Sequence, residues 1–198
     1  MGPFCLVPKM ECNHGILSLV HKLSGSLNIN GEEINFDDGY GYIEKDWGRS
    51  FPKTYTWLHF KEDGGENTVV VSTADIPFLI RTFKGLIAVV YENGKEYRLA
   101  TYNGGRIIKC NNNEIVIKKR KYLLKIFVSD CVGQPLKAPV LGDMARIIKE
   151  KLTCAMKVEF YKGKKCIFKR ESNRASFENV RVYASADTGY VCSDSLVM

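Results

Sequence analysis

Asn-Gly pairs and other turn signals divide most of this 198-residue chain into short segments. The pairs Asn30-Gly31 and Asn93-Gly94 are the strongest of these signals, because a type I′ hairpin turn needs positive φ at both of its central residues. Further turn signals stand at 63–65, 103–105, 111–113 and 162–164. The segments between them are rich in β-branched and aromatic residues: 68–73, 86–91, 106–110, 114–118, 122–128, 156–161 and 166–169. Many short strands at turn-to-turn spacing predict an all-β, antiparallel sandwich or barrel rather than βαβ units.

One stretch departs from this pattern, at residues 143–152. Its apolar residues have helical spacing: Met144, Ile147, Ile148 and Leu152. Asp143 precedes them as an N-cap, so the sequence predicts one short helix there. The preceding residues 131–142 contain Pro135 and Pro139 and are typical of a loop.

Length and composition limit the number of domains, the location and the partners that we expect. We expect one domain over residues 1–183, with the small and polar residues 184–198 as a loosely packed C-terminal tail. No apolar run reaches the roughly 18 residues of a membrane span, and no secretory signal is evident, so the expected location is the cytoplasm. The net charge is +7, but the main basic cluster at 118–121 fits a solvated strand junction. Because no nucleic-acid-binding module is recognisable, we expect no nucleic-acid partner.

The seven cysteines are an odd number, irregularly spaced, with no Cys-x-x-Cys. We expect them to be reduced thiols that pack mostly as small apolar side chains. Cys5, Cys12, His14 and His21 lack the paired spacing of zinc sites. The sequence therefore predicts no metal and no cofactor.

Residues 41–52 combine two carboxylates, an arginine and an indole within about one strand and turn. Alternate side chains of an extended strand share a face, so Tyr42, Glu44 and Asp46 point one way and Trp47 points the other. Two carboxylates on one face repel each other, which raises the pKa of one of them. The segment therefore predicts a carboxylic acid that stays protonated near neutral pH.

The same segment resembles a known family. The pattern Gly-x-x-Glu-Lys-Asp-Trp-Gly-x-Ser-Phe-Pro over 41–52, followed by Trp57, is similar to the signature of the tocopherol cyclase family. Residues 8–15 and 142–150 are similar to that family as well. The resemblance is specific from about Phe4 to Phe60 and diffuse, though compatible, from there to about Val180.

The resemblance implies a lipocalin-like (calycin) β-barrel that binds an apolar prenylated quinol or another isoprenoid. Members of the family carry a further β-rich half ahead of the motif, so this chain is expected to hold only the part of the family that contains it. The family's reaction adds a phenol across a prenyl double bond and closes a ring. An active protein would thus be an intramolecular lyase of the isomerase class.

Protonating an alkene needs a neutral carboxylic acid in a dry pocket, with an electron-rich surface beside the developing cation. Glu44 and Asp46 are the first candidates for this acid. The alternative is a solvated surface pair with Lys45 and Arg49 as its ion-pair partners, because charged residues are rarely buried unless paired. A guanidinium close to a carboxylate would also lower its pKa and remove the acid role.

Aromatic and imidazole side chains near the motif are the other candidates. Trp47 and Trp57 would stabilise a cation over their rings, or they simply pack in the core. His59 shares a strand face with Trp57 and is the best candidate for a base, although a lone histidine is more often structural. The remaining candidate ligand-binding residues are Tyr42, Glu11, His14 and Arg49.

Two main functions stay open at this point. One is a tocopherol cyclase-like enzyme, and the other is a lipocalin-like carrier that holds a hydrophobic ligand without chemistry, since a fold does not define a function. A third is a structural or interaction protein with a barrel filled by its own side chains. A homodimer is a further hypothesis, because a second copy would supply a second β-rich surface.

Overall fold

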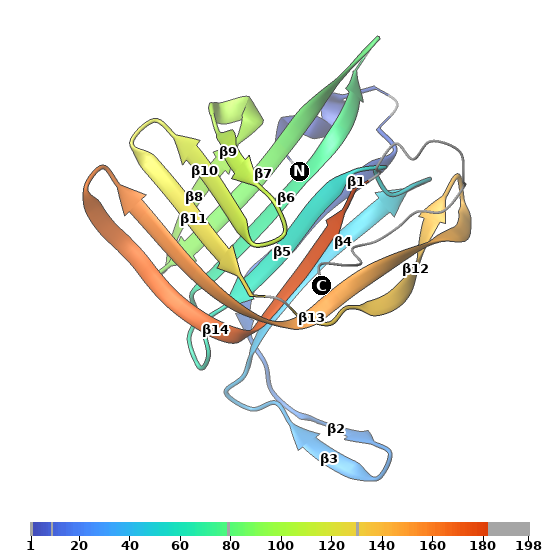
Figure 1. Ribbon diagram of the computed structural model, residues 1–198. Helices are drawn as coiled ribbons and strands as arrows, with labels where there is room; N and C mark the ends of the chain where they lie inside the picture. Colours follow the sequence, from blue (N-terminus) through green and yellow to red (C-terminus); the bar gives the residue numbers. More distant parts are fainter. Residues whose placement is uncertain (1, 9, 79, 130, 182–198) are drawn as a thin grey trace, which may run out of the picture.

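The computed structural model describes residues 2–8, 10–78, 80–129 and 131–181 (Figure 1). Within them the chain forms a succession of β-strands and two short 3-10 helices, η1 (Gly2–Leu6) and η2 (Thr101–Asn103). The strands are β1 (Cys12–Lys22), β2 (Ser26–Ile29), β3 (Glu32–Asn35), β4 (Tyr40–Gly48), β5 (Tyr55–Lys61), β6 (Thr68–Phe78), β7 (Arg81–Glu92), β8 (Lys95–Ala100), β9 (Arg106–Cys110), β10 (Glu114–Lys119), β11 (Tyr122–Val128), β12 (Gln134–Val140), β13 (Asp143–Lys162) and β14 (Lys165–Val180). The predicted all-β, antiparallel class is therefore confirmed.

Ten of these strands form one curved sheet, in the order β8-β7-β6-β5-β14-β13-β11-β10-β9, with β12 paired to β13. The sheet curls so that its two ends approach each other (Figure 1). Lys119 Nζ at the end of β10 donates a hydrogen bond to Arg98 O of β8, at 2.8 Å. No backbone ladder joins these two ends among the described residues, so this lipocalin-like sheet is curled but not closed.

The concave side of the curled sheet holds the main core. Alternation along β5 sends Leu58 and Phe60 into this core, where both are fully buried. Phe60 meets Phe168 edge to face, with ring centroids 6.0 Å apart, and Phe160 stacks on Tyr122. The interior that the resemblance predicted as the ligand cavity is therefore filled by the protein's own side chains.

The other face of β5 carries a second layer, the two-stranded antiparallel sheet β1–β4. Trp57 Nε1 donates to Glu44 Oε2 at 3.0 Å, and the ring of Tyr42 stacks on His59 with centroids 4.0 Å apart. These contacts come from one face of β4, which confirms that Tyr42 and Glu44 share a face. The layer is thus positioned by polar and aromatic contacts rather than by a second aliphatic core.

The residues predicted as a helix form the first half of β13 instead. Ile148 lies opposite Leu136 of β12 and is buried, whereas Ile147 is 58% exposed. Neighbouring residues therefore point to opposite faces, which is the strand period of two. The helix prediction was wrong because pairing with β12 and β14, far along the chain, outweighs the local spacing of the apolar residues.

The predicted loop 131–142 is also corrected, because most of it forms β12. Among the described strands, β12 pairs only with β13 and so lies at an edge. Edge strands tolerate proline, whose missing N–H is lost only from the solvent side. Pro135 and Pro139 are therefore compatible with a strand here.

The Asn-Gly turn predictions are confirmed. Asn30 and Gly31 have φ angles of 55° and 92°, and Asn93 and Gly94 have 48° and 76°. Positive φ at both central positions is the type I′ requirement. The predicted basic junction at 118–121 is likewise the turn between β10 and β11.

Cys131 and Cys154 are joined by a disulfide, with their Cα atoms 5.6 Å apart. The expectation that all thiols are reduced was wrong for this pair, because folding brings together two cysteines that sequence spacing does not associate. Disulfides are rare in a reducing cytosol, so the bond weighs against the cytoplasmic location, which stays a prediction. The predicted tail at 184–198, and the domain boundary before it, lie outside the described residues. None of the described helices is long and apolar enough to cross a membrane.

Candidate functional site

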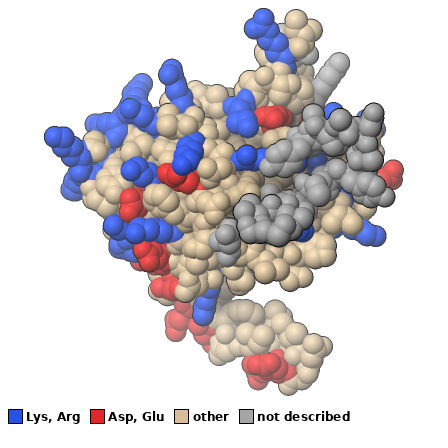
Figure 2. All heavy atoms as spheres, in the orientation of Figure 1, with Lys and Arg blue, Asp and Glu red and all other residues tan. Residues whose placement is uncertain are grey.

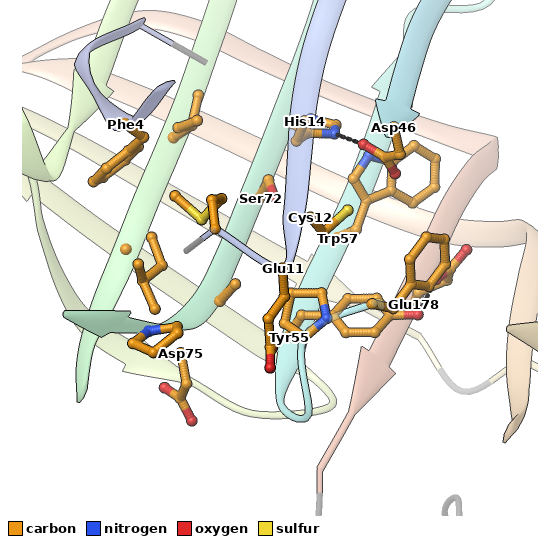
Figure 3. Close-up of a pocket in the computed structure, with 18 of the residues that line it drawn as sticks. Phe4, Glu11, Cys12, His14, Asp46, Tyr55, Trp57, Ser72, Asp75 and Glu178 are labelled. Atoms are coloured by element: carbon orange, nitrogen blue, oxygen red, sulfur yellow. Dashed lines mark hydrogen bonds and ion pairs between the residues drawn. The ribbon is translucent and has the colours of Figure 1, made fainter. Parts of the chain in front are cut away.

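A pocket of about 120 Å³ lies between the two layers (Figure 3). Its floor is the convex face of the curled sheet, and the β1–β4 sheet and η1 cover it. The pairing of β5 with its two neighbouring strands brings the residues of this floor together. Trp57 of β5 lies opposite Ser72 of β6 on one side and opposite Glu178 of β14 on the other. Directly opposed residues on neighbouring strands share a face. The pocket is therefore built by pairing between segments more than one hundred residues apart.

His14 and Asp46 are directly opposed on β1 and β4, and both line the pocket. His14 Nδ1 lies 2.7 Å from Asp46 Oδ1, shown by the dashed line in Figure 3. His14 Nε2 is buried, has no hydrogen-bond partner within the described part of the chain, and lies 3.7 Å from Glu44 Oε2. Because an ionised aspartate only accepts, His14 donates Nδ1–H to Asp46. In the neutral form of the ring the lone pair is then on Nε2, which makes this atom a candidate base or ligand acceptor.

Glu44 also lines the pocket, and its oxygen Oε2 has two donors. Tyr42 Oη donates to it at 2.6 Å, and Trp57 Nε1 donates at 3.0 Å. Burial, followed by the hydrogen bond to Glu44 and the charges of Glu44 and Asp46, raises the pKa of the Tyr42 hydroxyl. Glu44 is thus an acceptor that orients Trp57 in the pocket wall.

Glu178, at the end of β14, is a pocket residue that the sequence analysis did not identify. Tyr55 Oη donates a hydrogen bond to Glu178 Oε2 at 2.8 Å. Burial, together with the nearby charges of Glu150, Glu44 and Asp46, raises the pKa of Glu178 to about 7, although the Tyr55 hydrogen bond opposes the shift. Glu178 is therefore the carboxyl group in this pocket that stays substantially protonated near neutral pH.

The signal for Glu178 in the sequence was weak. The residue lies in the diffuse part of the family resemblance, far from the motif, and nothing local distinguishes it from a solvated glutamate. Its environment comes from β5 and β4, which precede it by more than one hundred residues. Phe177 is buried in the core, so strand alternation places Glu178 on the convex face of the sheet. That face forms a pocket only because the β1–β4 sheet covers it, which the local sequence does not indicate.

Apolar side chains complete the pocket walls: Phe4, Met10, Phe51, Pro52, Ala74, Ile76, Pro77 and Ile87. Cys12 also lines the pocket, and burial and the charge of Asp46 raise the pKa of its thiol to about 12. The thiol therefore stays protonated and behaves as a small apolar group. Such a lining suits an apolar ligand with a few polar atoms.

The structure places several predicted site residues outside this pocket. Trp47 points away from it and is 49% exposed, because it lies on the opposite face of β4 from Asp46. Arg49 follows the strand, and its backbone N–H donates to Glu11 O. Among the described residues it forms no ion pair with Glu44 or Asp46, so the predicted neutralising guanidinium is not in place. Glu11, by contrast, lines the pocket.

His59, the predicted base, lies behind Tyr42 and does not line the pocket. Its Nε2 is 3.0 Å from Thr68 Oγ1, which donates its own proton to Phe60 O. His59 Nε2 must therefore carry the proton in this hydrogen bond. Burial and the charge of Lys61 lower the pKa of His59 to about 4, so the ring is neutral and acts as a packing residue.

No group of three or more His, Cys, Asp or Glu side chains that could hold a metal ion occurs within the described part of the chain. The chemistry available in the pocket is thus that of a protonated carboxyl group, an imidazole oriented by a carboxylate, and aromatic ring faces. These groups can transfer protons and stabilise a cation.

A curled antiparallel sheet with a covered pocket on its convex face defines an all-β protein of the lipocalin-like class. Within that class the chain belongs to the tocopherol cyclase-like family, whose family model matches residues 11–180.

One solved structure with a similar fold is a kievitone hydratase from Nectria haematococca. It matches with a TM-score of 0.51 and 14% sequence identity. The match covers 85% of this chain and 53% of the hydratase, so this chain spans about half the length of that protein. At this identity the likeness is one of fold.

Proposed function

We propose that the protein binds a prenylated phenol or quinol in this pocket and adds an O–H group across the prenyl double bond. The observation that carries the proposal is the pairing of two groups in one apolar pocket: the protonated Glu178 and the unpartnered Nε2 of His14. An acid and a base held in different protonation states are the two groups that such an addition needs.

The proton balance of the reaction is simple. Glu178 gives its proton to one alkene carbon, which leaves a tertiary cation on the other carbon. The phenolic oxygen bonds to that cation, and its proton passes to His14 Nε2. Proton exchange with solvent then restores both residues, so substrate and product are isomers and no oxidant or reductant takes part.

Three neighbours support these roles. Asp46 holds His14 with Nε2 free and stabilises the imidazolium that forms. Trp57 presents an indole face, fixed by its bond to Glu44, beside the developing cation. Tyr55 positions the Glu178 carboxyl group. Asp46 thus keeps a place in the mechanism as a positioning residue, while the acid role passes to Glu178.

The test is turnover of a monoprenylated hydroquinone in ordinary water and in D2O, followed by mass spectrometry of the product. We expect a cyclic product of unchanged mass in water and one added deuterium on carbon in D2O. Glu178→Gln should remove this activity. Glu92→Gln is a matched control, because Glu92 is another buried glutamate whose pKa is raised by burial, and it does not line the pocket. Equal loss in both variants would contradict the proposal.

Addition of water to the alkene is the closest alternative chemistry, and the name of the hydratase with the similar fold makes it worth measuring. In that reaction water replaces the phenolic oxygen as the nucleophile, and the product is heavier by one water. The same mass spectrum distinguishes the two outcomes. Both depend on Glu178 as the acid.

A carrier without chemistry is the second candidate function. The apolar walls of the pocket and the neutral thiol of Cys12 favour it, since both suit a bound isoprenoid that is not converted. Native mass spectrometry of the purified protein would then show a co-purifying apolar molecule. Trp57→Ala should release this molecule, whereas Glu178→Gln should retain it. An unoccupied pocket from several expression hosts would contradict the carrier function.

A further inference from the structure

The β1–β4 layer continues into a projecting arm, residues 23–39, which contains β2 and β3 (Figure 1). Every residue of both arm strands is exposed. Leu27 and Ile34 are directly opposed on one face of the arm, with exposed fractions of 57% and 37%. A two-stranded hairpin with no covering layer is marginally stable in water. The arm therefore has the properties of a segment that is covered in the functional assembly.

The sheet that carries the arm has an uncovered apolar face of its own. One face of β1–β4 covers the pocket, and the other exposes Ile43 and Trp47 at 48% and 49%. Leu17, at 64%, lies beside them at the bulge between Ile16 and Ser18. The Trp47 ring lies against Gly15, where an added Cβ would come within 3.1 Å of ring atom Cζ3. Lys45 Nζ lies over the same ring, 5.9 Å from its centroid, and half of the Trp47 side chain is still exposed and available for contact. Large apolar side chains that gather on one surface usually mark an interaction site.

Charge is divided unevenly between the arm and the rest of the chain. The arm holds four acidic residues and no lysine or arginine: Glu32, Glu33, Asp37 and Asp38. Since the whole chain carries +7, the remainder carries +11. Figure 2 shows acidic side chains on and beside the projecting arm and basic side chains over the body. A partner for the arm would need an apolar surface to contact Leu27 and Ile34, surrounded by basic side chains to pair with the acidic residues.

We propose that this partner is a second copy of the same chain, which forms a two-fold dimer across the outer face of β1–β4. A two-fold contact is self-complementary, so Leu17, Ile43 and Trp47 would meet the same residues of the second copy. The acidic arm of each copy would then extend over the cationic body of the other. Such a dimer would also hold in place the sheet that positions His14 and Asp46, independently of which chemistry the pocket performs.

The experiment is sedimentation equilibrium of the whole protein over a concentration series that brackets about 1 μM, a common range for specific association. We expect a monomer–dimer equilibrium. Ile43→Lys should weaken it by at least about tenfold, because it removes buried apolar area and introduces a charge at the contact. Ile108→Lys is the matched control, since Ile108 on β9 is another exposed isoleucine of a strand, at 60% against 48% for Ile43. It should leave the equilibrium unchanged.

The arm can be removed without unpairing the layer that supports it. Phe36 N donates to Gly25 O and Leu23 N donates to Gly39 O, so an Asn-Gly link in place of residues 26–35 would keep the base of the hairpin. We expect this variant to dimerise more weakly and with less dependence on salt, since arm charges are screened at high ionic strength.

Variants at the contact could weaken the dimer simply by misfolding, so a second measurement leaves the contact residues unchanged. In a Trp57→Phe background Trp47 is the single indole, and its emission should shift to the red on dilution as the dimer dissociates. A monomer at every concentration would overturn the proposal. So would a dimer that responds equally to Ile43→Lys and Ile108→Lys, or one in which Trp47 emission is independent of concentration, because another surface or partner would then form the contact.

Discussion

His14 stands directly opposite Asp46 across the β1–β4 ladder, and its Nδ1 lies 2.7 Å from the aspartate oxygen. This one relationship gives the motif a role that its composition did not indicate. The Asp46 carboxylate is hydrogen-bonded to the His14 imidazole on the neighbouring strand, and so it orients a candidate base. The protonated carboxyl group of the pocket is Glu178, at the other end of the chain.

Asp46→Asn should lower turnover by at least about 100-fold while leaving the fold intact, because an amide does not fix the same tautomer or stabilise an imidazolium. Turnover of the prenylated hydroquinone and circular dichroism of the variant check this expectation. Asp143→Asn, which neutralises an exposed aspartate on β13, is the control. A fully active Asp46→Asn protein would remove the residue from the mechanism.

Glu178→Gln should lower turnover by about 100-fold or more, since glutamine cannot protonate an alkene. In the unmodified protein, turnover should fall as the pH rises through about 7, where Glu178 loses its proton. A pH–rate profile measures this limb. If the variant kept both its activity and the same alkaline limb, another group would be the acid.

Glu178 and His59 should affect stability with opposite dependence on pH. The pKa of Glu178 is raised from 4.5 to about 7, so the folded state holds its proton more tightly, and stability falls as pH rises between these values. The pKa of His59 is lowered from 6.5 to about 4, so the unfolded state binds protons first, and stability falls as pH drops between these values. Each effect amounts to about 3 kcal/mol, and the two nearly cancel where they overlap.

Urea unfolding across that overlap, about pH 5 to pH 6.5, checks the prediction. Glu178→Gln should become more stable with rising pH, because only the histidine effect remains. His59→Gln should become less stable over the same range. Two variants with the same slope would show that other groups control the pH dependence.

Reduction of the Cys131–Cys154 disulfide should lower the free energy of unfolding by about 3 kcal/mol, because the bond closes a loop of 23 residues in the unfolded chain. Urea unfolding with and without a reductant measures this difference. Cys131→Ser should show the lower value in both conditions. Alkylation and mass spectrometry of the unreduced protein should leave this pair unmodified, and labelling of both thiols would contradict the bond.

Local signals in the sequence predicted a large part of the fold. Asn30-Gly31 and Asn93-Gly94 predicted their turns because positive φ depends on the residues themselves. The strand runs between turns were predicted by β-branched and aromatic content, which suits a pleated, half-buried surface. The failures were residues 131–142 and 143–152, where the partner strand decides the outcome.

The candidate site divides in the same way. Strand alternation by itself determined that Tyr42, Glu44 and Asp46 share a face, since the period of two is a local property of extended backbone. Only the tertiary structure decided that His14 lies against Asp46, that His59 is packed behind Tyr42, and that the pocket lies on the convex side of the sheet. Burial raises the pKa of Glu178, and burial is produced by strands far away in the sequence, so local residue patterns could not reveal the acid.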